Sequence, residues 1–293
     1  MRIDNSALKA FQFCPAYYQE RYDNKIELKG EASSALVFGK AFHAMLEARL
    51  KDEPLREDVW DGVPEEIQVE CEYTYEKYCQ VYPVETWETV AVEKLVEVPI
   101  EECEACHGTG SAEFFEPDKP CAECEGTGVS VTYVAKIDWI ARGPEGLRIV
   151  DHKTEERGSV NNTHQRWQYL TQVSLYQWAV AQVYPEPIDK ITIDIITRRS
   201  LKGRCDPEFS RIDTLRTPWQ QNQALETLRY AARQIKEMKA AKWEDNLWPQ
   251  NRENCQKWRV PCPYAMIHGE SGRDEGTLQA KYRPAEEYLA PRA

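Results

Sequence analysis

The chain has 293 residues, of which 42% are hydrophobic and 29% charged, a composition typical of one large globular domain or two small ones. Its net charge of −12 counts against a protein that coats nucleic acid, because non-specific binding grows with the number of phosphates that basic side chains neutralise. The sequence has no apolar run of about 18 residues, which excludes a membrane-spanning helix, and its N-terminus has no export signal. We therefore expect a cytoplasmic protein without membrane contact.

The predicted elements alternate between helices and strands. A first helix over residues 4–22 is interrupted at Pro15, and two more are expected over 35–51 and 65–82. Residues 87–100 alternate between Val and Glu, which favours a strand. The remaining expected elements are strands over 129–141, 147–154 and 188–197 and helices over 164–184 and 218–242, before a polar tail from about residue 269.

The segment Gly143–Gly146 predicts the turn of a β-hairpin. Counting outward from this turn, Asp138 lies opposite Asp151, and opposed residues have Cβ atoms about 4.5–5.5 Å apart. Two carboxylates at that distance repel each other unless a cation lies between them, so the pattern favours a magnesium or manganese ion. Lys153 shares the face of Asp151. A metal and a lysine would together suit phosphodiester hydrolysis; the alternative is an exposed hairpin with ordinary surface charges.

Four short motifs resemble those of one known family. Residues 133–138 (YVAKID) followed by 149–154 (IVDHKT) resemble the core motif of the PD-(D/E)XK nuclease superfamily and are most similar to its RecB-like branch. Residues 39–47 are similar to the G-x-x-x-H-x-x-L-E helix of that branch, and residues 172–176 to its Q-x-x-x-Y helix. Ala135 departs from the branch, which usually has glycine at this position.

The resemblance covers residues 6–268 apart from a cysteine-rich insertion. It implies an α/β fold with a restriction-endonuclease-like core, in which helices flank a mixed central sheet. It also implies a magnesium- or manganese-dependent DNA exonuclease in recombination, repair, phage DNA processing or CRISPR spacer acquisition. An endonuclease or nickase, or a non-catalytic DNA-binding assembly subunit, are the alternatives. The expected partners are DNA, single-stranded or with free ends, and a recombination or CRISPR-adaptation protein.

The resemblance also assigns site residues. It makes His43 a metal ligand, together with the main-chain carbonyl of His152, and places Gln172 and Tyr176 on the substrate backbone or on Lys153. The residues themselves leave other interpretations open, since a histidine on an apolar helix face is often only packed, and a tyrosine one turn from a glutamine can be a core residue. The expected catalytic set is His43, Glu93, Asp138, Asp151, Lys153, Gln172 and Tyr176, with Glu93 the weakest member and Glu47 a candidate to orient His43 or Lys153.

Residues 101–128 contain two near copies of the pattern C-x-x-C-x-G-x-G. Each C-x-x-C turns two thiolates inward, and four thiolates suit tetrahedral zinc. The expected ligands are Cys103, Cys106, Cys121 and Cys124. The repeat resembles half of the zinc-binding region of DnaJ chaperones, although the chain has no His-Pro-Asp signature of a J-domain. Disulfides or a redox site are the alternatives, and the insertion could contact DNA or a partner, or only cap its hairpin.

A second, split set of ligands joins the two ends of the chain. Cys14, Cys255 and Cys262 match positions that hold an iron–sulfur cluster in RecB-like nucleases, but His268 stands where the family has its last cysteine. An iron–sulfur cluster with one histidine ligand, a zinc ion held by three thiolates and an imidazole, and a relic held by packing all remain open. The other thiols, at Cys71, Cys79 and Cys205, have no partner at ligand spacing.

A basic run is expected to bind phosphates, unless it is only a solvated loop. Its residues are Arg198, Arg199, Lys202 and Arg204. The predicted organisation is an N-terminal helical part with the first core strand (1–100), a zinc-binding insertion (101–128), the nuclease core with the C-terminal helix and split metal site (129–268), and the polar tail (269–293).

Overall fold

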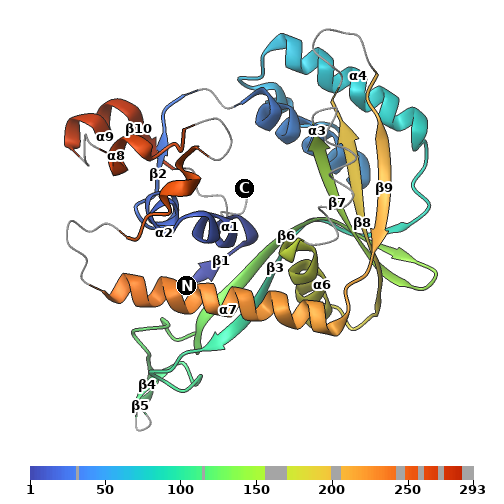
Figure 1. The fold of residues 1–293 in the computed structure, drawn as a ribbon. Helices are drawn as coiled ribbons and strands as arrows, with labels where there is room; N and C mark the ends of the chain where they lie inside the picture. Colours follow the sequence, from blue (N-terminus) through green and yellow to red (C-terminus); the bar gives the residue numbers. More distant parts are fainter. Residues whose placement is uncertain are drawn as a thin grey trace. The chain divides into compact units, whose positions relative to one another are not determined.

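The structure is a computed structural model that describes residues 1–30, 33–113, 116–155, 170–198, 206–241, 248–256, 261–269 and 274–285. The chain divides into two compact units (Figure 1). Unit 1 comprises Met1–Glu31, Ile100–Val131 and Glu226–Ala293, and unit 2 comprises Ala32–Pro99 and Thr132–Leu225. Among the described residues, no helix combines the length and the apolar character that crossing a bilayer requires.

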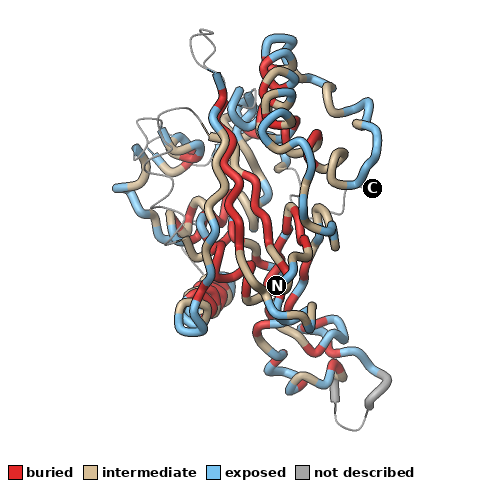
Figure 2. The backbone as a smooth tube through the Cα atoms, turned by 90° about the vertical axis from the view of Figure 1, so that its right-hand side faces the viewer, coloured by how far each residue is buried: buried red, intermediate tan, exposed pale blue. Residues whose placement is uncertain are grey.

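Unit 2 is built around a mixed β-sheet. Its strands are β3 (Glu88–Glu102), β6 (Val129–Gly143), β7 (Gly146–Glu155), β8 (Ile188–Thr197) and β9 (Phe209–Thr214), and the first two continue into unit 1. The order is β6-β7-β8-β9, with β3 paired to β6. Strands β7 and β8 are parallel, whereas β6–β7 and β8–β9 are antiparallel. The middle strands are buried along most of their length (Figure 2), as their β-branched sequences predict.

The β6–β7 hairpin has the register expected from the sequence. Gly143 pairs with Gly146, and the pairs continue to Trp139 with Val150. Glycine is required at position 146, because its φ is +144° and an added Cβ would come within 2.4 Å of the Pro187 carbonyl oxygen. The turn therefore fixes which residues of the two strands meet.

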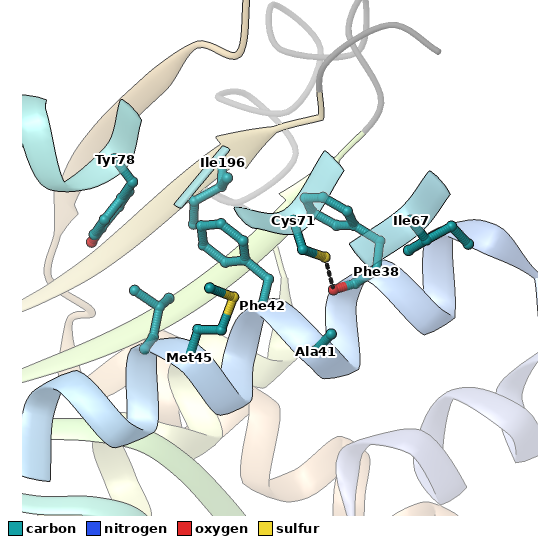
Figure 3. Packing of buried hydrophobic residues seen from close by; sticks show 9 residues of the cluster. Phe38, Ala41, Phe42, Met45, Ile67, Cys71, Tyr78 and Ile196 are labelled. Atoms are coloured by element: carbon teal, nitrogen blue, oxygen red, sulfur yellow. Dashed lines mark hydrogen bonds between the residues drawn. The ribbon is translucent and has the colours of Figure 1, made fainter. Parts of the chain in front are cut away.

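Helices cover both faces of this sheet. Helix α3 (Ser34–Lys51) packs against β7, where the absence of a side chain on Gly39 allows close approach to Thr154. Helix α4 (Glu65–Val81) packs on α3, and α6 (Thr171–Val183) contacts β8. The predicted helical residues 164–169 lie outside the described part of the chain. Figure 3 shows the core between α3, α4 and β8, which includes Phe38, Phe42, Met45, Cys71, Tyr78 and Ile196.

Unit 1 contains the two ends of the chain. The first predicted helix is divided at proline as expected, into α1 (Asn5–Phe13) and α2 (Pro15–Tyr18), followed by a π-helical turn, Gln19–Asp23. Helix α7 (Pro218–Ala240) enters this unit from unit 2. The shorter elements are β1 (Arg2–Ile3), β2 (Ile26–Leu28), β4 (Ser111–Glu113), β5 (Glu116–Pro120), α8 (Ala265–His268), α9 (Glu275–Lys281) and β10 (Tyr282–Pro284), of which β2 pairs with β10 and β4 with β5.

Candidate active site

The candidate site lies in unit 2, just beyond the last register pair of the β6–β7 hairpin. After Trp139 and Val150, the main-chain N–H of His152 donates a hydrogen bond of 2.8 Å to Oδ2 of Asp138. Beyond the last strand pair, a hydrogen bond from the main chain to a side-chain carboxylate therefore replaces the hydrogen bonds between the two strands. This bond holds Asp138 beside the segment 151–153.

Asp138 belongs to a group of three candidate metal ligands. One ligand atom each from His43, Glu93 and Asp138 lies within 4.8 Å of the other two. His43 Nδ1 is 3.8 Å from Asp138 Oδ2, and the carboxylate of Glu93 is paired with Lys136. Glu93 has a φ of +52°, a left-handed backbone conformation that is uncommon for a residue with a side chain. An imidazole and two carboxylates suit a divalent cation.

Asp151 and Lys153 form a second part of the same site. Lys153 Nζ lies 2.7 Å from the Asp151 carboxylate and donates a hydrogen bond to its Oδ1. Asp151 is 2% exposed, and the Lys153 ammonium also lies 2.7 Å from its Oδ2. A buried carboxylate needs a compensating positive charge, which Lys153 supplies here and a bound cation would increase.

The electrostatics of the site depend on burial and on these charges. Burial lowers the pKa of His43 to about 4, so its imidazole is neutral near pH 7 and able to bind a metal. Burial opposes ionisation of Asp138, but His43 and Lys153 hold the pKa of this carboxyl below its usual value. Burial raises the pKa of Asp151, against the effect of Lys153 and with that of Asp138. The negative charges of Asp138 and Asp151 therefore repel each other, and a bound divalent cation would offset that repulsion.

Helix α6 contributes a buried pair to the same side of the sheet as Asp151. Gln172 Nε2 donates a hydrogen bond of 2.9 Å to the hydroxyl of Tyr176. Burial, and next to it the charge of Asp151, raises the pKa of Tyr176 well above its usual value. The helix face expected from the Q-x-x-x-Y motif therefore points at the candidate site. Glu47 does not orient His43 through a direct ion pair, because its carboxylate pairs with Lys51 at 2.6 Å.

The expectation that Arg198 binds DNA needs correction. Arg198 is 6% exposed, and its Nε and Nη2 donate to the two carboxylate oxygens of Glu70 at 3.2 and 2.7 Å. The Arg198 guanidinium is therefore paired inside unit 2, although the basic run in the sequence suggested a position on the surface. Arg199, Lys202 and Arg204 lie outside the described residues.

The four paired cysteines of residues 101–128 come together in unit 1. Their sulfur atoms all lie within 4.8 Å of one another, and each cysteine is buried: Cys103, Cys106, Cys121 and Cys124. The main-chain N–H groups of Gly110 and Gly128 each donate to a sulfur, at 3.3 Å. Both glycines have a positive φ, as expected where the backbone turns its amides toward thiolates.

The split set of candidate ligands at the chain ends does not form a comparable group in the structure. No three of the candidate ligand atoms of Cys14, Cys255, Cys262 and His268 lie within 4.8 Å of one another. His268 Nε2 instead lies 3.4 Å from the carboxylate of Glu20, which is fully buried. Cys14 accepts a hydrogen bond of 3.3 Å from the N–H of Asn251. A metal at this position stays a prediction.

One residue beside the site was not anticipated. Asp194, on β8, is fully buried and lies 3.0 Å from Nδ1 of His152. The carboxylate of Asp194, between Ile193 and Ile195 in the β-branched run 188–197, was the signal that could have indicated it.

The comparison with family models places the chain in one class of enzymes. The model of the PD-(D/E)XK nuclease superfamily matches residues 5–267. The chain belongs to the PD-(D/E)XK nuclease superfamily, and it is therefore a nuclease, with DNA implied as its substrate and a divalent metal as its usual cofactor.

A solved structure described as a "Putative exonuclease" from Eubacterium rectale is similar to this chain, with a TM-score of 0.48 and 15% sequence identity over 91% of this chain and 92% of the other. A search of curated proteins found no significant match.

Proposed function

We propose that the protein is a magnesium- or manganese-dependent DNA exonuclease whose active site consists of His43, Glu93, Asp138, Asp151 and Lys153. The proposal depends above all on one observation, the convergence of His43, Glu93 and Asp138 to within 4.8 Å beside the Asp151–Lys153 pair. In the proposed site the side chains of His43, Asp138 and Asp151, with the His152 carbonyl and with help from Glu93, would hold the ion.

The side chains have distinct roles in this mechanism. A bound divalent ion would polarise the scissile phosphate and lower the pKa of a water molecule. Neutral His43 and the carboxylates of Asp138 and Asp151 would hold the ion. Lys153, held by Asp151 at 2.7 Å, directs its ammonium at the nucleophile or at the charge that develops on the phosphate. Gln172 and Tyr176, on α6, form one side of the site, where they would contact the substrate backbone or Lys153.

Cleavage of end-labelled DNA tests the proposal. Linear single-stranded DNA is expected to be shortened from an end in Mg²⁺ or Mn²⁺ and to stay intact in EDTA, while circular single-stranded DNA of the same sequence stays closed. Opening of the circle would indicate an endonuclease or nickase instead. No cleavage of either substrate in any metal would favour a non-catalytic DNA-binding subunit of a recombination, repair, phage or CRISPR-adaptation assembly.

We further propose that the four cysteines of residues 101–128 bind one structural zinc ion. Four buried thiols with amide donors fit the tetrahedral thiolate set that zinc prefers. A segment this short cannot bury a core of its own, so the ion would supply the free energy that folds it.

Metal analysis checks the zinc assignment. The purified protein is expected to contain one equivalent of zinc, and a variant with Cys103, Cys106, Cys121 and Cys124 changed to serine should lose it. Cys79→Ser is the matched control, because this thiol lies outside the group, and it should keep the zinc. Equal zinc content in the fourfold variant and the control would contradict the assignment.

A further inference from the structure

A row of charged side chains crosses three strands of the sheet directly behind the candidate active site. His152 on β7 is in register with Asp194 on β8, and Asp194 is in register with Arg211 on β9. Partners in register point to the same face of a sheet. His152 Nδ1 lies 3.0 Å from Asp194 Oδ2, and Arg211 Nε lies 3.6 Å from Asp194 Oδ1.

Two further side chains complete the row. The Tyr78 hydroxyl, from α4, donates to Asp194 and accepts a hydrogen bond of 2.8 Å from Arg211 Nη2. Arg211 also binds both carboxylate oxygens of Glu85, at 2.7 and 3.0 Å. His152, Asp194 and Tyr78 are almost completely buried, with exposed fractions of 3%, 0% and 1%.

A gain in folding stability does not by itself explain why these charged side chains are buried together. Burying a carboxylate is costly, and well-packed apolar residues in place of a buried ion pair are often at least as stable. Two groups of the network, Asp194 Oδ1 and Arg211 Nε, even lack a hydrogen bond of good geometry. Such a network has a clearer purpose where it holds a neighbouring group in place.

That neighbouring group is the main chain of His152. Its N–H binds Asp138, and its flanking residues are Asp151 and Lys153. We propose that Asp194 is a positioning residue, which fixes the His152 side chain and through it the main-chain segment that orients the carboxylates of the divalent-ion site. This inference rests on the proposed function, because it assigns Asp194 to the metal affinity of that same site.

The sheet contains a matched control two residues away. Thr192 on β8 is in register with Asp213 on β9 and donates to it at 2.7 Å, and Arg148 approaches the same carboxylate at 3.3 Å. This second polar row crosses the same strands, although Asp213 is 43% exposed, and its β7 neighbour in register is Val150, which takes no part in the proposed site. Asp213→Asn therefore removes a cross-strand charge of the same sheet without touching the site.

Binding of Mn²⁺ to the DNA-free protein, measured by electron paramagnetic resonance of the unbound ion, tests the inference. Asp194→Asn is expected to weaken binding by about tenfold to a hundredfold, the range found when groups behind metal ligands are removed. Asp213→Asn should bind Mn²⁺ as the unchanged protein does. The Mg²⁺ concentration that gives half-maximal cleavage should rise in Asp194→Asn. The cleavage rate at saturating Mg²⁺ should fall by a smaller factor than that concentration rises.

The outcomes separate this inference from the proposed function. Unchanged Mn²⁺ affinity in folded Asp194→Asn overturns the positioning role. If that variant does not fold, His152→Gln takes its place, because it removes the imidazole that Asp194 contacts and keeps the main-chain N–H that binds Asp138, and an unchanged affinity there is equally decisive. A protein that binds Mn²⁺ but cleaves no DNA contradicts the proposed function and leaves the comparison of affinities valid. A protein that binds no Mn²⁺ contradicts both.

Discussion

Lys153→Ala is expected to slow DNA cleavage by about a hundredfold to a thousandfold, the usual loss when one charge-stabilising group is removed from an active site. Asp151→Asn should have an effect at least as large, because it removes a proposed metal ligand and the carboxylate that holds Lys153 at 2.7 Å. Initial rates in saturating Mg²⁺ measure both effects. The secondary structure should stay the same, since both changes leave the main-chain pairing of β7 with β8 intact.

The control for this experiment is Lys190→Ala. Lys190 lies on β8 in the same unit, is 40% exposed and has ion-pair distances to Asp189 and Asp213 of 3.9 and 4.0 Å, so it contributes little. Its loss should leave the cleavage rate within about twofold of the original, because its exposed ion pairs contribute little and their partners, Asp189 and Asp213, lie outside the proposed site. Cleavage by Lys153→Ala at the rate of this control would remove Lys153 from the mechanism.

The second large effect concerns stability. Arg198→Ala is expected to lower the free energy of unfolding by about 3–5 kcal/mol, because it leaves the carboxylate of Glu70 buried without a partner. Both side chains are almost fully buried, at 6% and 5% exposed. The change should appear as a lower midpoint of urea denaturation monitored by circular dichroism.

Two comparisons identify the cause of that loss. Glu70→Leu combined with Arg198→Met should recover part of the stability, since an apolar pair leaves no buried charge. Arg56→Ala breaks an exposed pair with Asp58, with side chains 51% and 63% exposed, and should change stability by less than about 1 kcal/mol. A loss in Arg198→Ala no larger than in Arg56→Ala would contradict the structural role of the pair.

The local parts of the fold could be predicted from the sequence. The register of the β6–β7 hairpin follows from its turn, and the division of the first helix follows from Pro15, which lacks an N–H and fixes φ. Helix α3 and strand β8 were predicted with nearly correct bounds, because hydrophobic periodicity is a property of neighbouring residues. Strand β9 was missed, since its six residues include an arginine and an aspartate.

Contacts between distant residues could not be predicted in the same way. Arg198 and Glu70 are 128 residues apart, so a basic run read alone gave no sign that one of its members is buried in an ion pair. Likewise, His268 lies against Glu20, 248 residues away. Glu93 was a weak candidate by sequence because glutamate is common on strands. Its left-handed backbone conformation and its place beside His43 are visible only in three dimensions.

The cysteine-rich insertion returns the chain to the point where it departed. The N–H of Cys103 bonds to the carbonyl of Gly128 at 2.8 Å, and the N–H of Cys121 bonds to that of Gly110 at 2.7 Å. Each repeat therefore closes on the other, and the entry and exit of the insertion are adjacent. Because the insertion leaves β3 and rejoins β6 at one place, its length and sequence can change during evolution without altering the pairing of these two strands.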